Sequence, residues 1–254
     1  MSSLVRNVGT IGGGTDQTAY GPGQYGMGWW FNGPNDTGDH GTSVASLVAA
    51  RGENASGITG VMWRADLRLH DAAIQPNGNV LLDPSGVPTP SALYFQLFQA
   101  GSEGTRVINV SWQINWWALM GHGYDPATET NATQDSVNRE LTRRVRDNFA
   151  GVIQNLELSS PSRRPLFVVA AGNTNTDAYW SGFPRARETY PRRVLVVAAA
   201  ERSSPGVFTR ASFSNTGADV IAPGERIGEH GGDLPVAADQ QAPGTGREPP
   251  AGWR

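Results

Sequence analysis

Hydrophobic residues recur at helical spacing in three stretches of the chain. Such spacing, with polar residues on the remaining faces, is typical of helices that pack one side against a core. It predicts helices over residues 40–51, 90–103 and 134–158, the last of which has the strongest pattern because a hydrophobic residue recurs every four positions. Their expected inward faces carry, in chain order, Val44, Leu47 and Val48; Leu93, Leu97 and Ala100; and Val137, Leu141, Val145, Phe149 and Ile153.

Short runs of consecutive hydrophobic residues, many of them β-branched, predict buried strands at 107–111, 166–171 and 194–199. A further strand is expected over Asp66–Ala73, and a short one near Ser3–Val8. Continuous hydrophobic strands that alternate with helices indicate a parallel sheet covered on both faces. The pattern therefore predicts an α/β fold with a central parallel sheet and helices on both sides.

The character of the sequence changes near both ends. Residues 1–39 are rich in Gly, Asn, Asp and aromatic residues without a clear period, which predicts an irregular N-terminal segment. After Ile227, Gly, Pro, Arg and acidic residues dominate, so we expect residues 228–254 to form a disordered tail. The folded domain is therefore expected over residues 40–227.

Composition excludes several classes of function. The net charge of −3 among 254 residues gives no reason to expect a nucleic-acid partner. The chain has no cysteine, so it has neither a disulfide framework nor a thiolate nucleophile. No stretch approaches the roughly 20 hydrophobic residues that span a bilayer, and the N-terminus lacks a signal-peptide pattern. We expect a monomer that does not contact a membrane.

One histidine stands where a catalytic base is often found. In Asp39-His40-Gly41-Thr42-Ser43-Val44-Ala45, the histidine opens a predicted helix, and the small residues after it allow the first turn to pack closely. A backbone-fixed imidazole suits a general base that must reach a nucleophile. The alternative is that His40 only caps its helix.

A second segment, Ala170-Ala171-Gly172-Asn173, directly follows a predicted strand. It places the carboxamide of Asn173 at the carboxyl edge of the sheet, where ligand sites of α/β proteins gather. Such an amide can donate a hydrogen bond to a developing oxyanion. The alternative is that Gly172 and Asn173 only turn the chain.

Two further segments follow in order: Ser212-Phe213-Ser214-Asn215-Thr216-Gly217, then Ala222-Pro223-Gly224. Together with the His40 and Asn173 segments they resemble the subtilisin-like serine peptidases, the subtilases, over roughly residues 36–227. The resemblance implies a three-layer α/β domain that hydrolyses peptide bonds through a serine acyl-enzyme. It also implies that His40 is the general base and acid and that Asn173 is an oxyanion donor.

The same resemblance gives a role to Ser111, Trp112 and Gln113. This segment stands where the family has an extended strand that pairs with a peptide or protein substrate, and backbone pairing of this kind reads a peptide without particular side chains. Gln113 occupies a position where the family has glycine, so we expect a narrowed or altered specificity pocket.

The chain departs from the family pattern at two catalytic positions. The triad runs Asp, His, Ser along the chain, yet the candidates upstream are Asp36, four residues before His40 and preceded by no hydrophobic run, and Asp16 in a Gly-rich stretch. No serine follows Ser214, and in Gly244-Thr245-Gly246 a glycine stands at the serine position. We therefore expect a truncated serine endopeptidase domain that is inactive as this chain.

Two other functions remain open at this point. The first is a non-catalytic, degenerate peptidase that binds peptides or a partner, with an exposed tryptophan-rich stretch at 112–117 available for contact. The second, with less support, is a nucleotide-binding α/β enzyme, which a parallel sheet alone would permit.

No cofactor is predicted. His70, His122 and His230 lack ligand-like spacing, so we expect no transition-metal site, and no acidic loop is diagnostic of calcium. Members of the family are commonly secreted, but the sequence carries no signal peptide that would assign a compartment.

Overall fold

A computed structural model describes residues 5–7, 44, 47–49, 60–62, 67–70, 90–114, 116–121, 123–160, 162 and 164–224. These residues belong to two compact units that divide after Gln96. In the first unit, β1 (Val5–Asn7) and β2 (Leu67–Leu69) form a parallel pair. Both lie where the sequence predicts strands. Residues 44 and 47–49 are helical as expected, and His40 lies outside the described residues.

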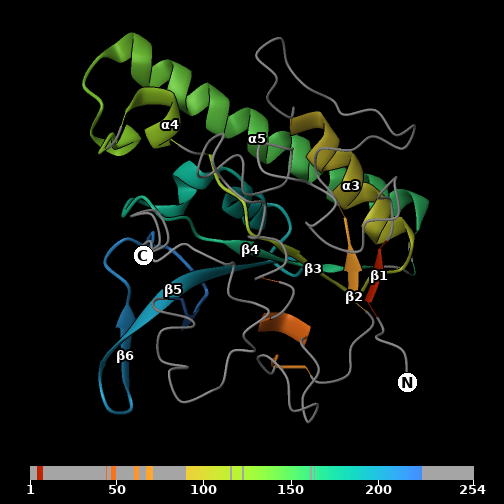
Figure 1. The fold of residues 1–254 in the computed structure, drawn as a ribbon. Helices are drawn as coiled ribbons and strands as arrows, with labels where there is room; N and C mark the ends of the chain where they lie inside the picture. The colour runs from red at the N-terminus through yellow and green to blue at the C-terminus, as the bar shows by residue number, and fades with distance from the viewer. Residues whose placement is uncertain are drawn as a thin grey trace, which may run out of the picture. The chain divides into compact units, whose positions relative to one another are not determined.

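The second unit is built on a five-stranded sheet (Figure 1). Strands β3, β4, β5 and β7 run parallel in that order, and β6 pairs antiparallel with the end of β5. Ala200 pairs with Arg210 of β6 and with Pro223 of β7, so these two strands lie on opposite sides of β5. The strands are β3 (Val107–Val110), β4 (Leu166–Ala170), β5 (Val194–Ser204), β6 (Val207–Arg210) and β7 (Val220–Pro223).

The α/β fold is confirmed, and β3, β4 and the first half of β5 match the predicted runs. The sheet is mixed, however, and not wholly parallel as expected, because β5 continues past Ala199 into a hairpin with β6. Gly206, with φ of +77°, allows the tight turn of this hairpin. The residues at the end of β5 are polar and largely exposed, so the predicted strand, which rested on a buried hydrophobic run, ended at residue 199.

Two long helices match the predicted ones. α3 (Pro90–Ser102) spans the division between the units, and α5 (Ala132–Ser159) lies wholly in the second. The side chain of Asn131 caps α5 by accepting hydrogen bonds from two main-chain N–H groups of its first turn. The short elements are α4 (Trp116–Met120), η3 (Pro126–Thr128), η4 (Ala178–Ser181) and η5 (Phe183–Glu188).

α5 covers one face of the sheet. The ring of Phe149 meets the rings of Phe167 on β4 and Phe183 on η5, with centroids 5.1 and 4.7 Å apart and edge-to-face geometry. All three rings are fully buried. The sheet residues on this face are also buried: Ile108, Val110, Phe167, Val169, Val194, Val196, Ala198 and Ala200.

The prediction for the inward face of α5 is wrong at its N-terminal end. Val137 is 55% exposed and Leu141 is half-buried, whereas Asn138 and Thr142 are fully buried. A step of four residues overshoots a full helical turn by about 40°. A strict four-residue repeat that faces the core at Ile153 therefore rotates away from it toward the start of the helix.

The opposite face of the sheet is less covered. Val107 is 58% exposed, Asn109 is also exposed, and Val168 and Ala170 of β4 are half-buried. Alternation along a strand places these side chains on the side away from α5. The segments that contain the predicted site, residues 111–114 and 171–176, follow the carboxyl ends of β3 and β4.

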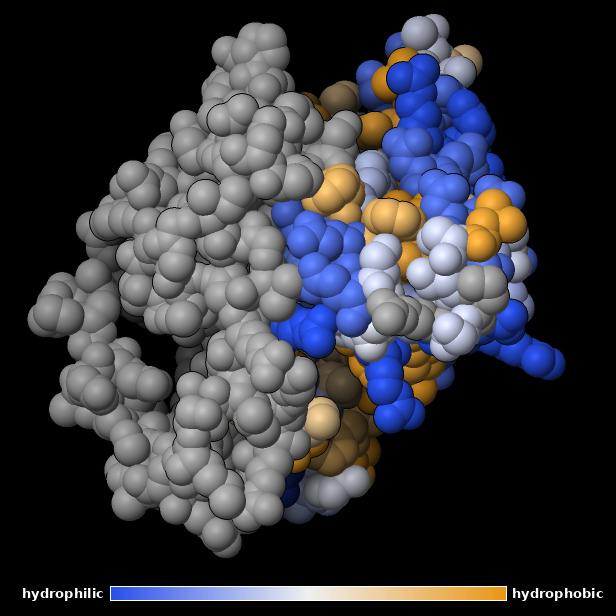
Figure 2. Space-filling view, turned by 90° about the vertical axis from the view of Figure 1, so that its right-hand side faces the viewer, coloured by the Kyte–Doolittle hydropathy of each residue, from blue (hydrophilic) through white to orange (hydrophobic). Residues whose placement is uncertain are grey.

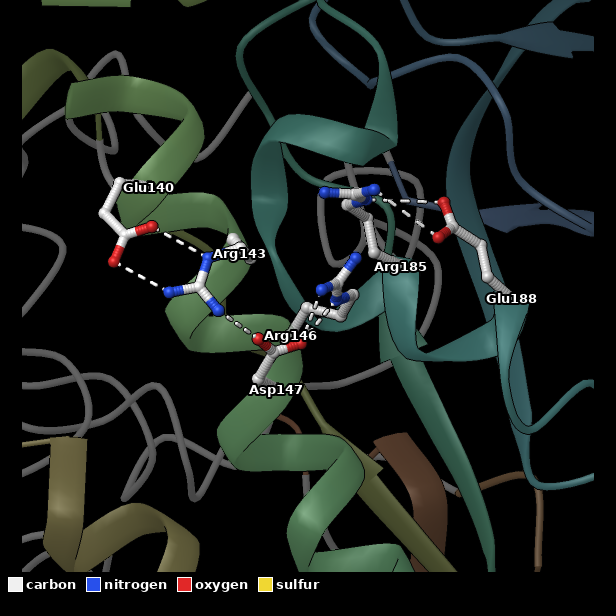
Figure 3. Close-up of polar contacts among 6 residues, drawn as sticks. All are labelled: Glu140, Arg143, Arg146, Asp147, Arg185 and Glu188. Atoms are coloured by element: carbon white, nitrogen blue, oxygen red, sulfur yellow. Dashed lines mark hydrogen bonds and ion pairs between the residues drawn. The ribbon is translucent and has the colours of Figure 1, made fainter. Parts of the chain in front are cut away.

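Charged side chains on the outer surface of the unit largely pair with one another (Figure 3). Arg143 of α5 bonds both Glu140 and Asp147, Arg146 also bonds Asp147, and on η5 Arg185 pairs with Glu188. Figure 2 shows one side of the molecule, where hydrophilic residues with interspersed hydrophobic ones make up the described surface. Exposed pairs of this kind contribute little to stability, because solvent screens them, and they do not form an open anion site.

Lowering the pH is expected to remove the contribution of Glu140. Hydrogen bonds from Arg143 and then Arg144 lower the pKa of its carboxyl group from 4.5 to about 2. Because the folded-state pKa is depressed, the stabilisation is fully present above pH 4.5 and is lost as the pH falls toward about 2. The urea midpoint of the wild type should exceed that of Glu140→Gln at neutral pH, and the difference should shrink across this window. A difference independent of pH would contradict the assignment.

Candidate functional site

The carboxyl ends of β3 and β4 bring two of the predicted site segments into contact. β3 continues into residues 111–114, and β4 continues into residues 171–176. The main-chain N–H of Asn173 donates a hydrogen bond to Oε1 of Gln113 at 2.7 Å. Two residues that the sequence places sixty positions apart thus meet at the carboxyl edge of parallel strands, where the fold was expected to form a site.

Asn173 presents its side chain to solvent. The residue is exposed, and among the described residues nothing hydrogen-bonds its carboxamide, whose N–H groups are therefore available to an oxygen atom. The preceding Gly172 has φ of +113°, and its carbonyl oxygen accepts a hydrogen bond from the main-chain N–H of Asn215 at 2.9 Å. The main chain around Asn173 is thus fixed on both sides while the side chain stays open.

The completely buried side chain of Asn215 holds the loop of residues 171–176 in place. Its Oδ1 accepts hydrogen bonds from the main-chain N–H groups of Thr174 and Thr176, each at 3.0 Å. Its Nδ2 donates to the carbonyl oxygen of Ala171 at 3.0 Å and to Oγ of Ser181 at 3.1 Å. One carboxamide therefore hydrogen-bonds main-chain groups both before and after Asn173.

Asn215 is a functional support that sequence reasoning missed. It lies in the segment 212–217, which the sequence analysis used only as part of the resemblance to the family and to which it gave no role at the site. The neighbouring Ser214 has a similar role, because its Oγ accepts a hydrogen bond from the main-chain N–H of Ala199 on β5 at 2.9 Å. The sequence showed only a run of small polar residues at 212–217, and such a run does not indicate which groups their side chains hydrogen-bond.

The three residues predicted to pair with substrate have different surroundings. Ser111 is half-buried and accepts a hydrogen bond from Nδ2 of Asn109 at 3.0 Å. Trp112 points the other way, into the core, where its ring meets Phe183 with centroids 4.8 Å apart.

The expectation of an exposed tryptophan-rich stretch is wrong for two of its members. Trp112 is 7% exposed and Trp116 only 2%, and Nε1 of Trp116 donates to the carbonyl oxygen of Trp180 at 2.8 Å. The physical reason lies in strand alternation, because Trp112 continues the inward series of Ile108 and Val110.

The described residues contain no group of three or more metal-ligating side chains. None of the helices in the part of the chain that the structure describes has the length and hydrophobicity needed to cross a bilayer. His40, Asp16 and residues 244–246 lie outside the described residues, so no distance relates them to Asn173.

Comparison with protein families identifies the chain. A model of the subtilase family matches residues 16–250, which is most of the sequence. The chain therefore belongs to the subtilase family. The match includes the segment 244–246, which lies beyond the limits of the resemblance drawn from the motifs alone.

Three solved structures that are similar to the chain are proteases with low sequence identity to it. A cold adapted subtilisin-like serine proteinase shares 24% identity over 56% of this chain and 38% of its own, with a TM-score of 0.31. A protease from Pseudoalteromonas arctica shares 20% identity over 71% and 42%, with a TM-score of 0.41. The maturation protease of prenylagaramide shares 18% identity over 71% and 50%, with a TM-score of 0.37.

The chain thus spans half or less of the length of these structures. No curated protein matches its sequence closely enough to count as a relative.

Proposed function

We propose that this chain is a peptidase domain that holds an extended peptide along Ser111–Gln113, with one peptide carbonyl directed at the carboxamide of Asn173. The observation that carries the proposal is the hydrogen bond between Gln113 and the main chain of Asn173, because it joins the pairing edge to the amide donor. Peptide recognition through main-chain pairing at a strand edge needs no particular side chain from the protein. The exposed carboxamide then supplies the polar contact that orients the carbonyl.

The family chemistry is the hydrolysis of a peptide bond through a serine acyl-enzyme. In that reaction His40 would take the proton of the nucleophile and return it to the leaving amine, and Asn173 would donate to the oxyanion. No serine occurs after Ser214, and Ser214 itself is buried and bonded to β5. We propose that the 254-residue chain by itself binds peptides without cleaving them.

A non-catalytic peptide- or partner-binding role is the second candidate. It is favoured by the completeness of the support around Asn173, where Gln113 and Asn215 satisfy the main chain of the loop independently of any nucleophile. Under this proposal the groove itself is the function, and turnover is absent at every condition tested.

Fluorophosphonate labelling combined with peptide binding tests both candidates. We expect no stoichiometric labelling of the chain and no release of peptides from casein, because the reagent requires a nucleophilic serine. We also expect saturable binding of a fluorescein-labelled alanine-rich peptide, measured by fluorescence anisotropy. Stoichiometric labelling, with the modified serine located by mass spectrometry, would show an active peptidase. Absence of peptide binding up to about 1 mM would remove the proposed groove.

A further inference from the structure

The carboxyl extensions of β3 and β4 part after their last paired residues, Val110 and Val169. Beyond that pair, the contact between the extensions is made by a side chain and not by a main-chain ladder bond: Oε1 of Gln113 accepts from the N–H of Asn173. A glutamine side chain therefore spans the space that opens between the two segments.

Gln113 fills this space from the less covered side of the sheet. Asn109 and Ser111 hydrogen-bond each other at 3.0 Å, which places their side chains on one side of the extension, and alternation puts Gln113 on that side too. Gln113 is nonetheless only 9% exposed. Its Oε1 lies 2.5 Å from the point that a Cβ atom on Gly172 would occupy. The carboxamide thus lies directly over the glycine that precedes Asn173.

A peptide in the proposed groove must place one side chain near this point. When the peptide pairs with residues 111–113 and one of its carbonyl groups reaches the carboxamide of Asn173, the residue with that carbonyl lies over the gap between the two extensions. Its side chain points either into the gap or to solvent, because strand side chains alternate. A side chain that points into the gap meets the carboxamide of Gln113 and the main chain of Gly172.

We propose that Gln113 determines specificity, restricting the peptide residue whose carbonyl faces Asn173 to a small side chain such as that of Gly, Ala or Ser. This inference rests on the proposed function, because it applies to the same groove. The restriction is steric: a larger side chain has to displace Gln113, which breaks its hydrogen bond with the main-chain N–H of Asn173. A single methylene group in a binding pocket changes discrimination by about 10- to 200-fold.

The test uses three fluorescein-labelled tetrapeptides, Ala-Ala-Ala-Ala, Ala-Ala-Ala-Leu and Ala-Ala-Ala-Phe. Each ends in a free carboxylate, whose oxygen can take the place of the carbonyl at Asn173 and so gives the peptides a common register. The wild-type chain should bind the peptide that ends in alanine at least about tenfold more tightly than the one that ends in phenylalanine. Gln113→Ala should bind the phenylalanine peptide at least about tenfold more tightly than the wild type does.

Two further variants serve as controls. Gln113→Glu keeps the length of the side chain and an oxygen acceptor, so it should keep the wild-type ranking. Gln154→Ala makes the same change as Gln113→Ala at an exposed position of α5 and should leave all three affinities unchanged.

Each result has a defined consequence. A wild type that prefers the phenylalanine peptide, or a Gln113→Ala variant that keeps the wild-type ranking, would overturn the role of Gln113 while leaving peptide binding intact. Failure of all three peptides to bind both proteins would overturn the proposed function and this inference with it. The wild-type ranking needs no variant, so it decides the question if Gln113→Ala does not fold.

Discussion

Replacement of Asn215 by alanine is expected to lower the free energy of unfolding by about 3–5 kcal/mol. The side chain is completely buried, and its removal leaves the N–H groups of Thr174 and Thr176 without their acceptor. Each buried donor that loses its partner costs about 1–3 kcal/mol. The carbonyl oxygen of Ala171 keeps a second bond from Ser181, which limits the loss. Urea denaturation followed by circular dichroism measures the change.

The matched control is Asn155→Ala, which makes the same change at an exposed position of α5. Its effect should stay within about 0.5 kcal/mol, because surface substitutions away from caps and cores are near neutral. Equal effects of the two substitutions would contradict the role assigned to Asn215. The Asn215→Ala protein should also lose peptide binding if the Asn173 loop depends on this carboxamide.

The main elements of the second unit could be predicted because their hydrophobic residues are regularly spaced. α3 has Leu93, Leu97 and Ala100 buried as expected, and the apolar runs of β4 and β5 pair in parallel. β6 and β7 were missed for a physical reason. Val207, Phe208, Val220 and Ile221 are between 45% and 51% exposed, so neither strand shows the buried pattern on which the prediction relied.

The candidate site was predictable only in part. The carboxyl ends of parallel strands share one edge, which is why Asn173 was expected there. The resemblance named Gln113 separately, and the sequence did not predict that its side chain would bond the main chain of Asn173. The contribution of Asn215 could not be predicted, because its partners lie about forty positions earlier and a buried amide follows no periodicity. A resemblance between motifs identified its segment, but not the hydrogen bonds that its carboxamide makes.

These contacts show that the support of the amide donor, Asn173, does not depend on the nucleophile that hydrolysis requires. The loop of Asn173 is held by side chains from the β3 extension and from the segment before β7, and neither contact involves a nucleophile. Preorganisation of an amide donor therefore depends on residues that the chain has, whereas hydrolysis depends on a serine for which the sequence offers no match. Under the proposed function, the chain would bind a peptide at these residues without cleaving it.

Gly172→Ala is expected to destabilise the chain by about 4 kcal/mol or more and to abolish peptide binding. Two effects add at this position. The φ of +113° is strained for any residue with a Cβ atom. The new methyl group would also lie 2.3 Å from Oγ of Ser181, 2.4 Å from Nδ2 of Asn215 and 2.5 Å from Oε1 of Gln113. Those are the atoms that hold the loop, so relief of the clash requires their hydrogen bonds to break.

Two other glycines separate these effects. Gly121 has φ of +100°, and nothing lies within 4 Å of the position that an added methyl group would take, so Gly121→Ala carries the backbone strain alone, about 1–2 kcal/mol. Gly151 lies inside α5 with open space and an ordinary helical conformation, so Gly151→Ala should be neutral or stabilising by up to about 1 kcal/mol. The urea midpoints of the three variants therefore give the steric cost at Gly172, as the loss of stability in Gly172→Ala beyond the loss in Gly121→Ala. If Gly172→Ala costs no more than Gly121→Ala, the close contact of Gln113, Ser181 and Asn215 over Gly172 does not exist in solution, and the tight support proposed for Asn173 is wrong.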